Sequence, residues 1–213
     1  MAAPLKPPAP APKLYLASRS PRRRELLKQI GIGFEVLLLR EQPGRGPDVN
    51  ETPLAGETPD DYVRRIGRLK ADVGWDRVLQ RQLPRHAVLA ADTTVCIDNQ
   101  ILGKPADRAD AARLLALLSG REHRVLTSVA IRFESRWKMT VNETVVRFRA
   151  LSQADIQVYV DSGEPMDKAG GYAIQGRAAA FVPELRGSYS GVMGLPLYET
   201  AQLIESFRAE GAG

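Results

Sequence analysis

The chain has 213 residues, of which 44% are apolar and 26% charged, so it can bury a core and is too apolar for extensive disorder. We predict one domain, possessing one or two lobes, over 13–208, and a disordered Pro/Ala-rich tail at 1–12. The net charge of +5 fits a phosphate-rich small substrate or a nucleic acid, and charge alone does not choose between them.

Membrane and secretory classes are not expected. No run of about 18 apolar residues occurs, so no transmembrane helix is predicted, and the first residues lack the apolar segment of a secretory signal. The single cysteine, Cys96, excludes an intramolecular disulfide and lies in an apolar run, where we interpret it as a core residue. The cytoplasm is therefore the expected compartment.

Periodicity and capping residues predict strands alternating with helices early in the chain and hairpins in the middle, which favours an α/β fold with a mixed sheet. Helix N-caps are expected at Ser20, Thr58, Asp107 and Ser152. The predicted strands are 13–17, 34–39, 87–91, 94–97, 123–133, 137–148, 172–174 and 180–185. The predicted helices are 21–30, 59–72, 108–118, 153–162 and 196–207, with a long loop at 42–57 that has the character of a functional loop.

The first predicted helix opens with three arginines, Arg22, Arg23 and Arg24. Cations near the positive end of a helix cost about 0.3 to 1 kcal/mol each unless something compensates. An anion bound by these arginines and by the free N–H groups at 18–22 would compensate, as at phosphate-binding helix starts. Phosphate binding is therefore predicted, with a solvated run of charge as the alternative.

Asp92 lies between the strand-like runs 87–91 and 94–97, and after a turn at 98–100 the chain supplies Lys104 between Gly and Pro. We expect the strand ends to fix the carboxylate and the turn to return a cation toward it. Taken alone this pattern is more typical of a turn or capping aspartate. A catalytic role for Asp92 thus needs other residues to support it.

The commonest nucleotide and zinc signatures are absent, including the Walker loop, G-x-G-x-x-G, paired C-x-x-C and H-E-x-x-H. His86 and His123 have no partner at ligand spacing, so acid–base work would fall to carboxylates. Magnesium takes oxygen ligands and keeps several waters, so Glu51 and Asp92 together with substrate phosphates could hold one ion.

A family resemblance rests on motifs that follow one another along the chain. They include Leu16-Ala17-Ser18-x-Ser20-Pro21-Arg22-Arg23, Asn50-Glu51, Arg68-Leu69-Lys70-Ala71, Ala91-Asp92-Thr93, Gly103-Lys104-Pro105, Asp167-Lys168-Ala169-Gly170 and Ile174-Gln175-Gly176. In these motifs the chain resembles the Maf family of nucleoside triphosphate pyrophosphatases over about 13–207. The resemblance implies an elongated, two-lobed mixed sheet flanked by helices, similar to the inosine triphosphate pyrophosphatase fold, with the active site between the lobes.

The resemblance also implies hydrolysis of a nucleoside triphosphate to the monophosphate and pyrophosphate, assisted by a divalent metal, Mg²⁺ or Mn²⁺, and it suggests a homodimer. Asp92 matches the catalytic base, Glu51 a second acid and metal ligand, and Lys70 and Lys104 catalytic cations. The residues matched to phosphate binding or substrate choice are Ser18, Arg22, Arg23, Thr93 and Gln175. The Thr and Gln pair is similar to the branch of the family that acts on dTTP and UTP.

The chemistry of Gln175 agrees with that branch, because a carboxamide can meet both the N3–H donor and the O4 acceptor of uracil or thymine. As alternatives, Gln175 is a loop amide and Thr93 a simple β residue. The run Arg177-Ala178-Ala179-Ala180 departs from a more Gly-rich family pattern beside Gln175, which makes base selectivity less certain than catalysis.

Two rival functions stay open. One is hydrolysis of 7-methyl-GTP, which belongs to another branch of the same family. The other is a nucleic-acid-binding regulator of septum formation that uses the basic surface. The sequence has no nucleic-acid motif and only 6% aromatic residues for stacking, so no nucleic-acid partner is expected.

Overall fold

The computed structural model describes residues 14–40 and 47–210. The strands are β1 (Leu14–Leu16), β2 (Phe34–Val36), β3 (Ala87–Ile97), β4 (Gln100–Leu102), β5 (Glu122–Phe133), β6 (Arg136–Arg147) and β7 (Glu184–Arg186). The helices are α1 (Pro21–Gln29), α2 (Pro59–Gln80), α3 (Arg108–Leu118), α4 (Gln153–Asp161), α5 (Tyr189–Met193) and α6 (Leu197–Ala209), with short 3₁₀ helices η1 (Ala169–Gly171) and η2 (Arg177–Phe181). The predicted tail at 1–12 and the loop residues 42–46 lie outside the described residues.

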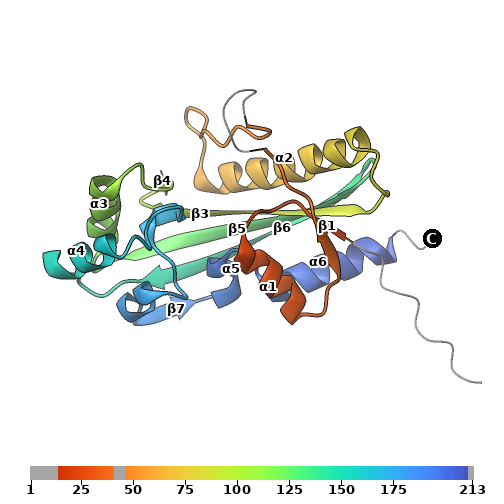
Figure 1. Ribbon diagram of the computed structural model, residues 1–213. Helices are drawn as coiled ribbons and strands as arrows, with labels where there is room; N and C mark the ends of the chain where they lie inside the picture. Colours follow the sequence, from red (N-terminus) through yellow and green to blue (C-terminus); the bar gives the residue numbers. More distant parts are fainter. Residues whose placement is uncertain (1–13, 41–46, 211–213) are drawn as a thin grey trace, which may run out of the picture.

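One mixed sheet of seven strands runs through the described part of the chain, in the order β2-β1-β3-β5-β6-β7 with β4 paired to β3. β1 is parallel to β2 and β3, and the other pairs are antiparallel. β5 and β6 pair over their full 12 residues and extend along the elongated molecule (Figure 1). The predicted α/β class, with a mixed sheet flanked by helices, is confirmed.

Helices cover both faces of the sheet. α2 lies along one face, while α1, α5 and α6 lie on the other (Figure 1). Successive residues of β3 alternate between the two faces, as side chains of a strand must. Val88 and Ala90 pack in a core with Trp75 of α2, whereas Leu89 and Ala91 pack in a core with residues of α1 and α6. β3 is therefore buried on both sides and is a rigid base for any side chain it carries.

A further core lies at the end of the sheet that carries α3, α4 and β7 (Figure 1). Its aromatic rings meet edge to face, as in the pairs of Phe148 with Tyr172 and of Tyr159 with Phe181. Such pairs contribute about 0.5 to 1.5 kcal/mol beyond area burial. This core is built mainly from residues after 100, and its described members include none from α1 or α2.

The predicted helix starts are confirmed. Ser20, Thr58, Asp107 and Ser152 each accept a hydrogen bond from a backbone N–H of the first turn. The predicted antiparallel hairpin is β5–β6, and Cys96 is buried as expected. Local capping chemistry in this chain therefore agrees with the final fold.

The prediction of two strands with Asp92 between them is wrong, because β3 is continuous from Ala87 to Ile97. Asp92 lies in mid-strand and pairs across to Ser128 of β5. A polar Asp-Thr-Thr run is tolerated there because β5 supplies a full partner on one edge. The backbone at Asp92 is consequently fixed by strand pairing and not by a turn.

The predicted end of α2 near Asp72 is also wrong, since the helix continues to Gln80. Its buried stripe extends through Trp75 and Val78, and Gly74 permits close packing on the sheet. A Cβ at Gly74 would lie 2.7 Å from Val88 Cγ1, which is too close for real side chains. The absence of a side chain at Gly74 therefore lets α2 pack closely against β3.

Near the C-terminus, the strand predicted at 172–174 is wrong, and of the strand predicted at 180–185 only the end is found, as β7. In the N-terminal part of the chain, the strand predicted at 34–39 is shorter than predicted, because β2 ends at Val36. Positive φ angles of 71° at Gly170 and Gly171 turn the backbone into η1, and η2 occupies 177–181. Only β7 pairs with the sheet in this region. Helix α5 was not predicted, because its five residues are too short to give a periodic pattern.

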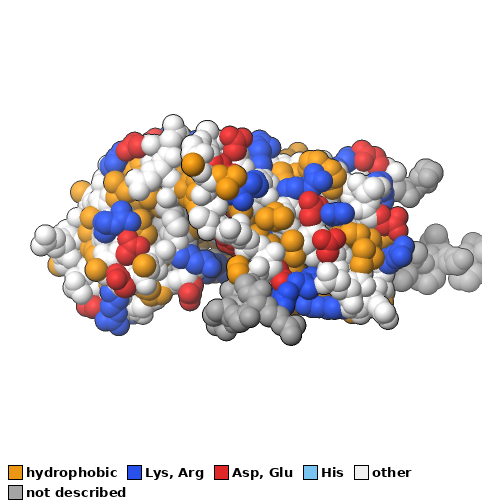
Figure 2. Space-filling view, turned by 90° about the horizontal axis from the view of Figure 1, so that it is seen from above, with side chains coloured by type: hydrophobic (Ala, Val, Ile, Leu, Met, Phe, Trp, Pro, Cys, Tyr) orange, Lys and Arg blue, Asp and Glu red, His pale blue; other side chains and the backbone are white. Residues whose placement is uncertain are grey.

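Figure 2 shows the face that carries α2, where basic and acidic side chains are interspersed and form no continuous basic stripe.

None of the described helices is long and apolar enough to cross a membrane.

Candidate active site

A cavity of about 580 Å³ lies at the edge of β3, a volume typical of small-molecule sites. On this edge β1 pairs with residues 87–89 and β4 pairs with 95–97, so residues 90–94 have no strand partner there among the described residues. Asp92 continues the alternation toward α2, and Thr93 continues it toward α1 and α5. Because both residues line the cavity, it reaches both faces of the sheet around the bare edge.

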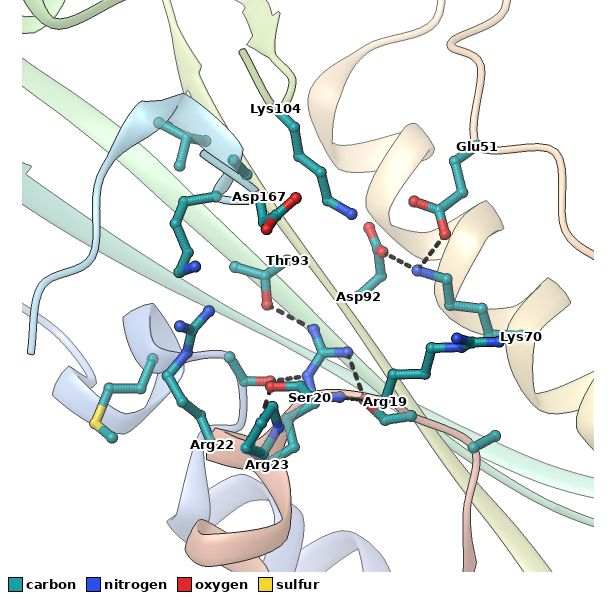
Figure 3. A pocket seen from close by; sticks show the side chains of 18 of the residues that line it. Arg19, Ser20, Arg22, Arg23, Glu51, Lys70, Asp92, Thr93, Lys104 and Asp167 are labelled. Carbon is teal, nitrogen blue, oxygen red and sulfur yellow. Dashed lines mark hydrogen bonds and ion pairs between the residues drawn. The ribbon is translucent and has the colours of Figure 1, made fainter. Parts of the chain in front are cut away.

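The α2 side of the cavity holds two carboxylates and one ammonium group. Lys70 Nζ donates to Asp92 Oδ1 at 2.7 Å and forms an ion pair with Glu51 Oε1 at 2.8 Å (Figure 3). Asp92 is only 5% exposed, and the Tyr62 hydroxyl holds the Glu51 segment by donating to its carbonyl oxygen at 2.9 Å. Burial lowers the pKa of Lys70, but the Asp92 and Glu51 charges outweigh it and hold that pKa above its usual value.

Arg23 connects the start of α1 to the bare edge of β3. Its guanidinium donates to Gly194 O at 2.7 Å, to Ala91 O at 2.7 Å and to the Thr93 hydroxyl at 3.2 Å. These acceptors are neutral, and in the described part of the chain no carboxylate lies within ion-pair distance of Arg23. Burial lowers its pKa, and Asp92 opposes that effect from a distance. The charge of Arg23 is thus fixed in place at the edge of β3.

Further cations line the cavity. Lys104 follows β4 and extends toward Asp92, and Arg22 rises from α1 (Figure 3). Lys168, which directly precedes η1, is another. Burial lowers the pKa of Lys168, and the neighbouring charges of Arg22 and Lys104 add to this effect. The described lining contains seven basic and three acidic side chains, a net charge of +4. Such a lining favours an anionic ligand that carries several charges.

One part of the lining is apolar. Val95 of β3 lies opposite Val125 of β5, and both line the cavity together with Tyr172, Val192 and Met193. The Tyr172 hydroxyl is held by a 2.8 Å hydrogen bond with buried His123 Nε2. Burial lowers the pKa of His123 to about 4, so this histidine is neutral at pH 7 and structural. The cavity therefore offers a basic region and, next to it, a wall suited to an uncharged ring.

The structure brings most of the predicted site residues together. Those that line the cavity are Ser18, Arg22, Arg23, Glu51, Lys70, Asp92, Thr93 and Lys104. Gln175 does not join them, because its side chain is exposed and lies outside the cavity lining. Its turn packs against Glu164, which accepts from Arg177 N at 3.2 Å and lies where a Cβ of Gly176 would clash.

Among the lining residues that the sequence-based prediction of the site missed are Asp167 and Lys168. Asp167 and Lys168 enter the cavity from the segment between α4 and η1. Asp167 has a φ of 66°, a left-handed conformation that Asp adopts more readily than most residues. The motif Asp167-Lys168-Ala169-Gly170 is the part of the sequence that could have indicated these residues. An aspartate that adopts a left-handed conformation and two glycines, all after a helix, place a lysine in a tight turn.

Asp92 and Glu51 are also the residues that could hold a divalent metal. Both carboxylates approach one point, the Lys70 ammonium group, and Mg²⁺ is typically bound by one or two carboxylates with substrate phosphates and waters. Among the described residues no group of three or more His, Cys, Asp or Glu forms a closed metal cage. The donors therefore fit a metal that arrives with phosphate ligands of its own.

Comparison with known proteins finds relatives that are similar over nearly the whole chain. Curated relatives named dTTP/UTP pyrophosphatase include one from Aromatoleum aromaticum, 57% identical over 92% of this chain and 95% of the relative. Others come from Nitrosomonas europaea, 57% identical over 90% and 93%, and Bordetella parapertussis, 57% identical over 93% and 94%. Among solved structures, the Ham1 protein of Staphylococcus aureus aligns with 79% of this chain and 90% of that chain, at 13% identity and a TM-score of 0.41.

A sequence model of the family described as Maf-like protein matches residues 13–207. That range includes the whole cavity lining and the motifs on which the resemblance rested. With relatives this similar over nearly their full length, the chain belongs to the Maf family.

Proposed function

We propose that the chain hydrolyses dTTP and UTP to the monophosphate and pyrophosphate. Asp92 carries the proposal, because it is a buried carboxylate held by Lys70 within a cavity of net positive charge. The three relatives of 57% identity are named for this activity, which supports the same substrates here.

In this proposal the triphosphate lies along the bare edge of β3. Lys70, Lys104 and Arg22 neutralise its charge, and Ser18 and the first turn of α1 offer hydrogen-bond donors. Asp92 orients a water molecule and accepts its proton as the water attacks phosphorus. Preorganised cations in a low-dielectric site stabilise the charge that develops in the transition state.

Glu51 and Asp92 would hold the metal in this arrangement. Bound there, a divalent ion would draw charge from the phosphate oxygens as a Lewis acid. Lys70 then contributes in a second way, since it keeps both carboxylates pointing toward the same place. Removal of metal by a chelator is expected to abolish turnover without unfolding the chain.

The base would lie against the apolar wall of the cavity, with Thr93 at its edge. Thr93 already lines the cavity, whereas Gln175 would contact the base only after its turn moves away from Glu164. We also infer a cytoplasmic location and a homodimer, the first from the single cysteine and the second from family membership.

Pyrophosphate release across a nucleotide panel tests the function. Purified protein with Mg²⁺ or Mn²⁺ is expected to convert UTP and dTTP to UMP or dTMP and pyrophosphate, and to act on CTP and 7-methyl-GTP more slowly. Release of inorganic phosphate with UDP, or preferential use of 7-methyl-GTP, would reject this assignment.

A further inference from the structure

A chain of hydrogen bonds runs from Arg23 into the sheet beneath the cavity. Arg23 Nη2 lies 3.2 Å from Thr93 Oγ1, and Thr93 Oγ1 lies 3.0 Å from Thr127 Oγ1. Thr127 Oγ1 in turn lies 2.8 Å from the Gly191 carbonyl oxygen of α5. Thr93 and Thr127 are directly opposite on β3 and β5, and Thr127 is completely buried.

The two end groups of this series of hydrogen bonds determine which hydroxyl donates to which. A guanidinium can only donate and a carbonyl oxygen can only accept, while each hydroxyl has one proton to donate. Thr127 must give its proton to Gly191 O, since two oxygens 2.8 Å apart without a proton between them would repel. Thr93, which accepts from Arg23, must then donate its proton to Thr127. The order Arg23 to Thr93 to Thr127 to Gly191 satisfies every group.

Thr93 therefore has no proton left for a ligand. Its remaining lone pair makes it an acceptor toward the cavity, and it lies on the same face of β3 as Val95, next to the apolar wall. Uracil and thymine each carry one ring N–H, at N3, whereas cytosine has a lone pair at that atom. Opposite ring atom N3, an acceptor-only hydroxyl thus matches uracil and thymine and is repelled by the N3 lone pair of cytosine.

We propose that Thr127 is a positioning residue that determines pyrimidine specificity, by holding the Thr93 hydroxyl as an obligate acceptor for the N3–H of the base. This inference rests on the proposed function. Thr127 does not line the cavity and acts through Thr93 alone. Without its oxygen, the Thr93 proton is free to turn into the cavity and to meet the N3 lone pair of cytosine.

Steady-state pyrophosphate release from UTP, dTTP and CTP tests the inference, with the ratio of kcat/KM for UTP to that for CTP as the readout. Thr127→Val is expected to reduce this ratio by about tenfold or more, the usual consequence of losing or mismatching one buried hydrogen bond. Thr127→Ser keeps the hydroxyl and should restore the wild-type ratio. Thr93→Val removes the acceptor itself, should fold because Thr93 is partly exposed, and should reduce the ratio as well.

Thr200→Val is a matched control, because Thr200 is also buried and donates its hydroxyl proton to a carbonyl, at 2.6 Å to Pro196 O, on a helix outside the cavity. It should leave the ratio unchanged. An unchanged ratio in Thr127→Val or Thr93→Val, or an equal fall in kcat/KM for all three nucleotides, would overturn the inference while leaving the proposed function intact. If wild-type protein releases pyrophosphate from neither UTP nor dTTP, the proposed function fails first.

Discussion

The two faces of β3 control the cavity in different ways. On the α2 face, Asp92 is held by charge, through an ammonium group shared with Glu51. Thr93, the next residue, faces the other side of the sheet. Its hydroxyl is held by directional hydrogen bonds with the Arg23 guanidinium and the neutral Thr127 hydroxyl. Adjacent residues of one strand therefore receive opposite kinds of support, because strand geometry sends them to opposite faces.

In the proposed function, this difference corresponds to the two ends of a nucleotide. Charge acts over several ångströms and suits a polyphosphate whose ionic partners change during the reaction. A hydrogen-bonded hydroxyl has a defined direction and suits a base that must be distinguished by a single proton. The bare edge of β3 allows one ligand to contact both faces. The predictions below disturb the charged face, whereas the Thr127 variants disturb the neutral one.

The largest expected effect belongs to Asp92→Asn. Asparagine has the same shape but cannot accept the proton of the attacking water, so kcat for UTP should fall by about 100-fold to 10 000-fold. Circular dichroism and thermal melting should show a folded protein. Asp98→Asn, on the exposed turn after β3 and outside the cavity lining, is the control and should retain activity. Activity near wild type in Asp92→Asn would remove Asp92 from the role of base.

Lys70→Met should reduce both activity and stability. It leaves Asp92 and Glu51 close together without their shared cation, at an expected loss of about 1 to 3 kcal/mol in the free energy of unfolding. Because the folded pKa of Lys70 is raised, its stabilising effect is present below about pH 10.5 and disappears as pH rises through that higher value.

Urea titrations of wild type and Lys70→Met at pH 7 and at strongly alkaline pH measure this effect. The difference between the two proteins should be largest at pH 7. Lys138→Met is the control, since Lys138 pairs with exposed Glu210 at the surface and its loss should cost less than about 1 kcal/mol. Equal losses in the two variants would mean that the Lys70 pair is no different from a surface pair.

Asp48→Asn should weaken the segment that carries Glu51. The Asp48 side chain is 1% exposed and accepts hydrogen bonds from Arg40 and Arg77. Burial alone would raise the pKa of Asp48, but these bonds outweigh it and lower that pKa to about 2. This shift stabilises the fold by about 2 kcal/mol above pH 4, and the contribution is lost as pH falls toward 2. Stability of the variant should therefore approach that of wild type in acid, as followed by denaturant titration. A difference that does not change with pH would contradict this account.

The smallest effect is expected from Gly67→Ala on α2. The new Cβ would lie 2.2 Å from Ser128 Oγ and 3.0 Å from Ser128 Cβ, which forces the helix or Ser128 to move. After the gain in helix propensity, a net loss of about 1 kcal/mol is expected from thermal melting. Gly33→Ala, with no atom within 4 Å of the new Cβ, should leave stability nearly unchanged. A Gly67→Ala protein as stable as wild type would show that α2 can shift freely.

Local chemistry in the sequence predicts that the start of α1 lines the cavity, and phosphate binding there stays a prediction. Ser20 as a cap, Pro21 after it and the unfavourable arginines at the helix start together indicate an anion site. These signals are short-range, so they depend little on the rest of the fold. The cavity lining contains Arg22 and Arg23 as expected, although Arg23 is largely committed to neutral oxygens of the protein.

The neutral side could not be predicted in the same way. The pairing of Thr93 with Thr127 depends on the register of β3 against β5, which links residues 34 positions apart. Its acceptor, Gly191 O, belongs to a helix too short to give a sequence signal. For Gln175 the sequence was misleading in the opposite way. A motif indicated that it belongs to the site, but its turn packs against Glu164 and the residue lies outside the cavity lining.

The central claim is that the two faces of β3 bind the two ends of one nucleotide. A crystal structure of the complex with a non-hydrolysable α,β-imido analogue of UTP tests it most directly. The account predicts the triphosphate near Lys70 and Lys104, and N3 of uracil within about 3.2 Å of Thr93 Oγ1. A uracil bound elsewhere, or a triphosphate remote from Asp92, would contradict it.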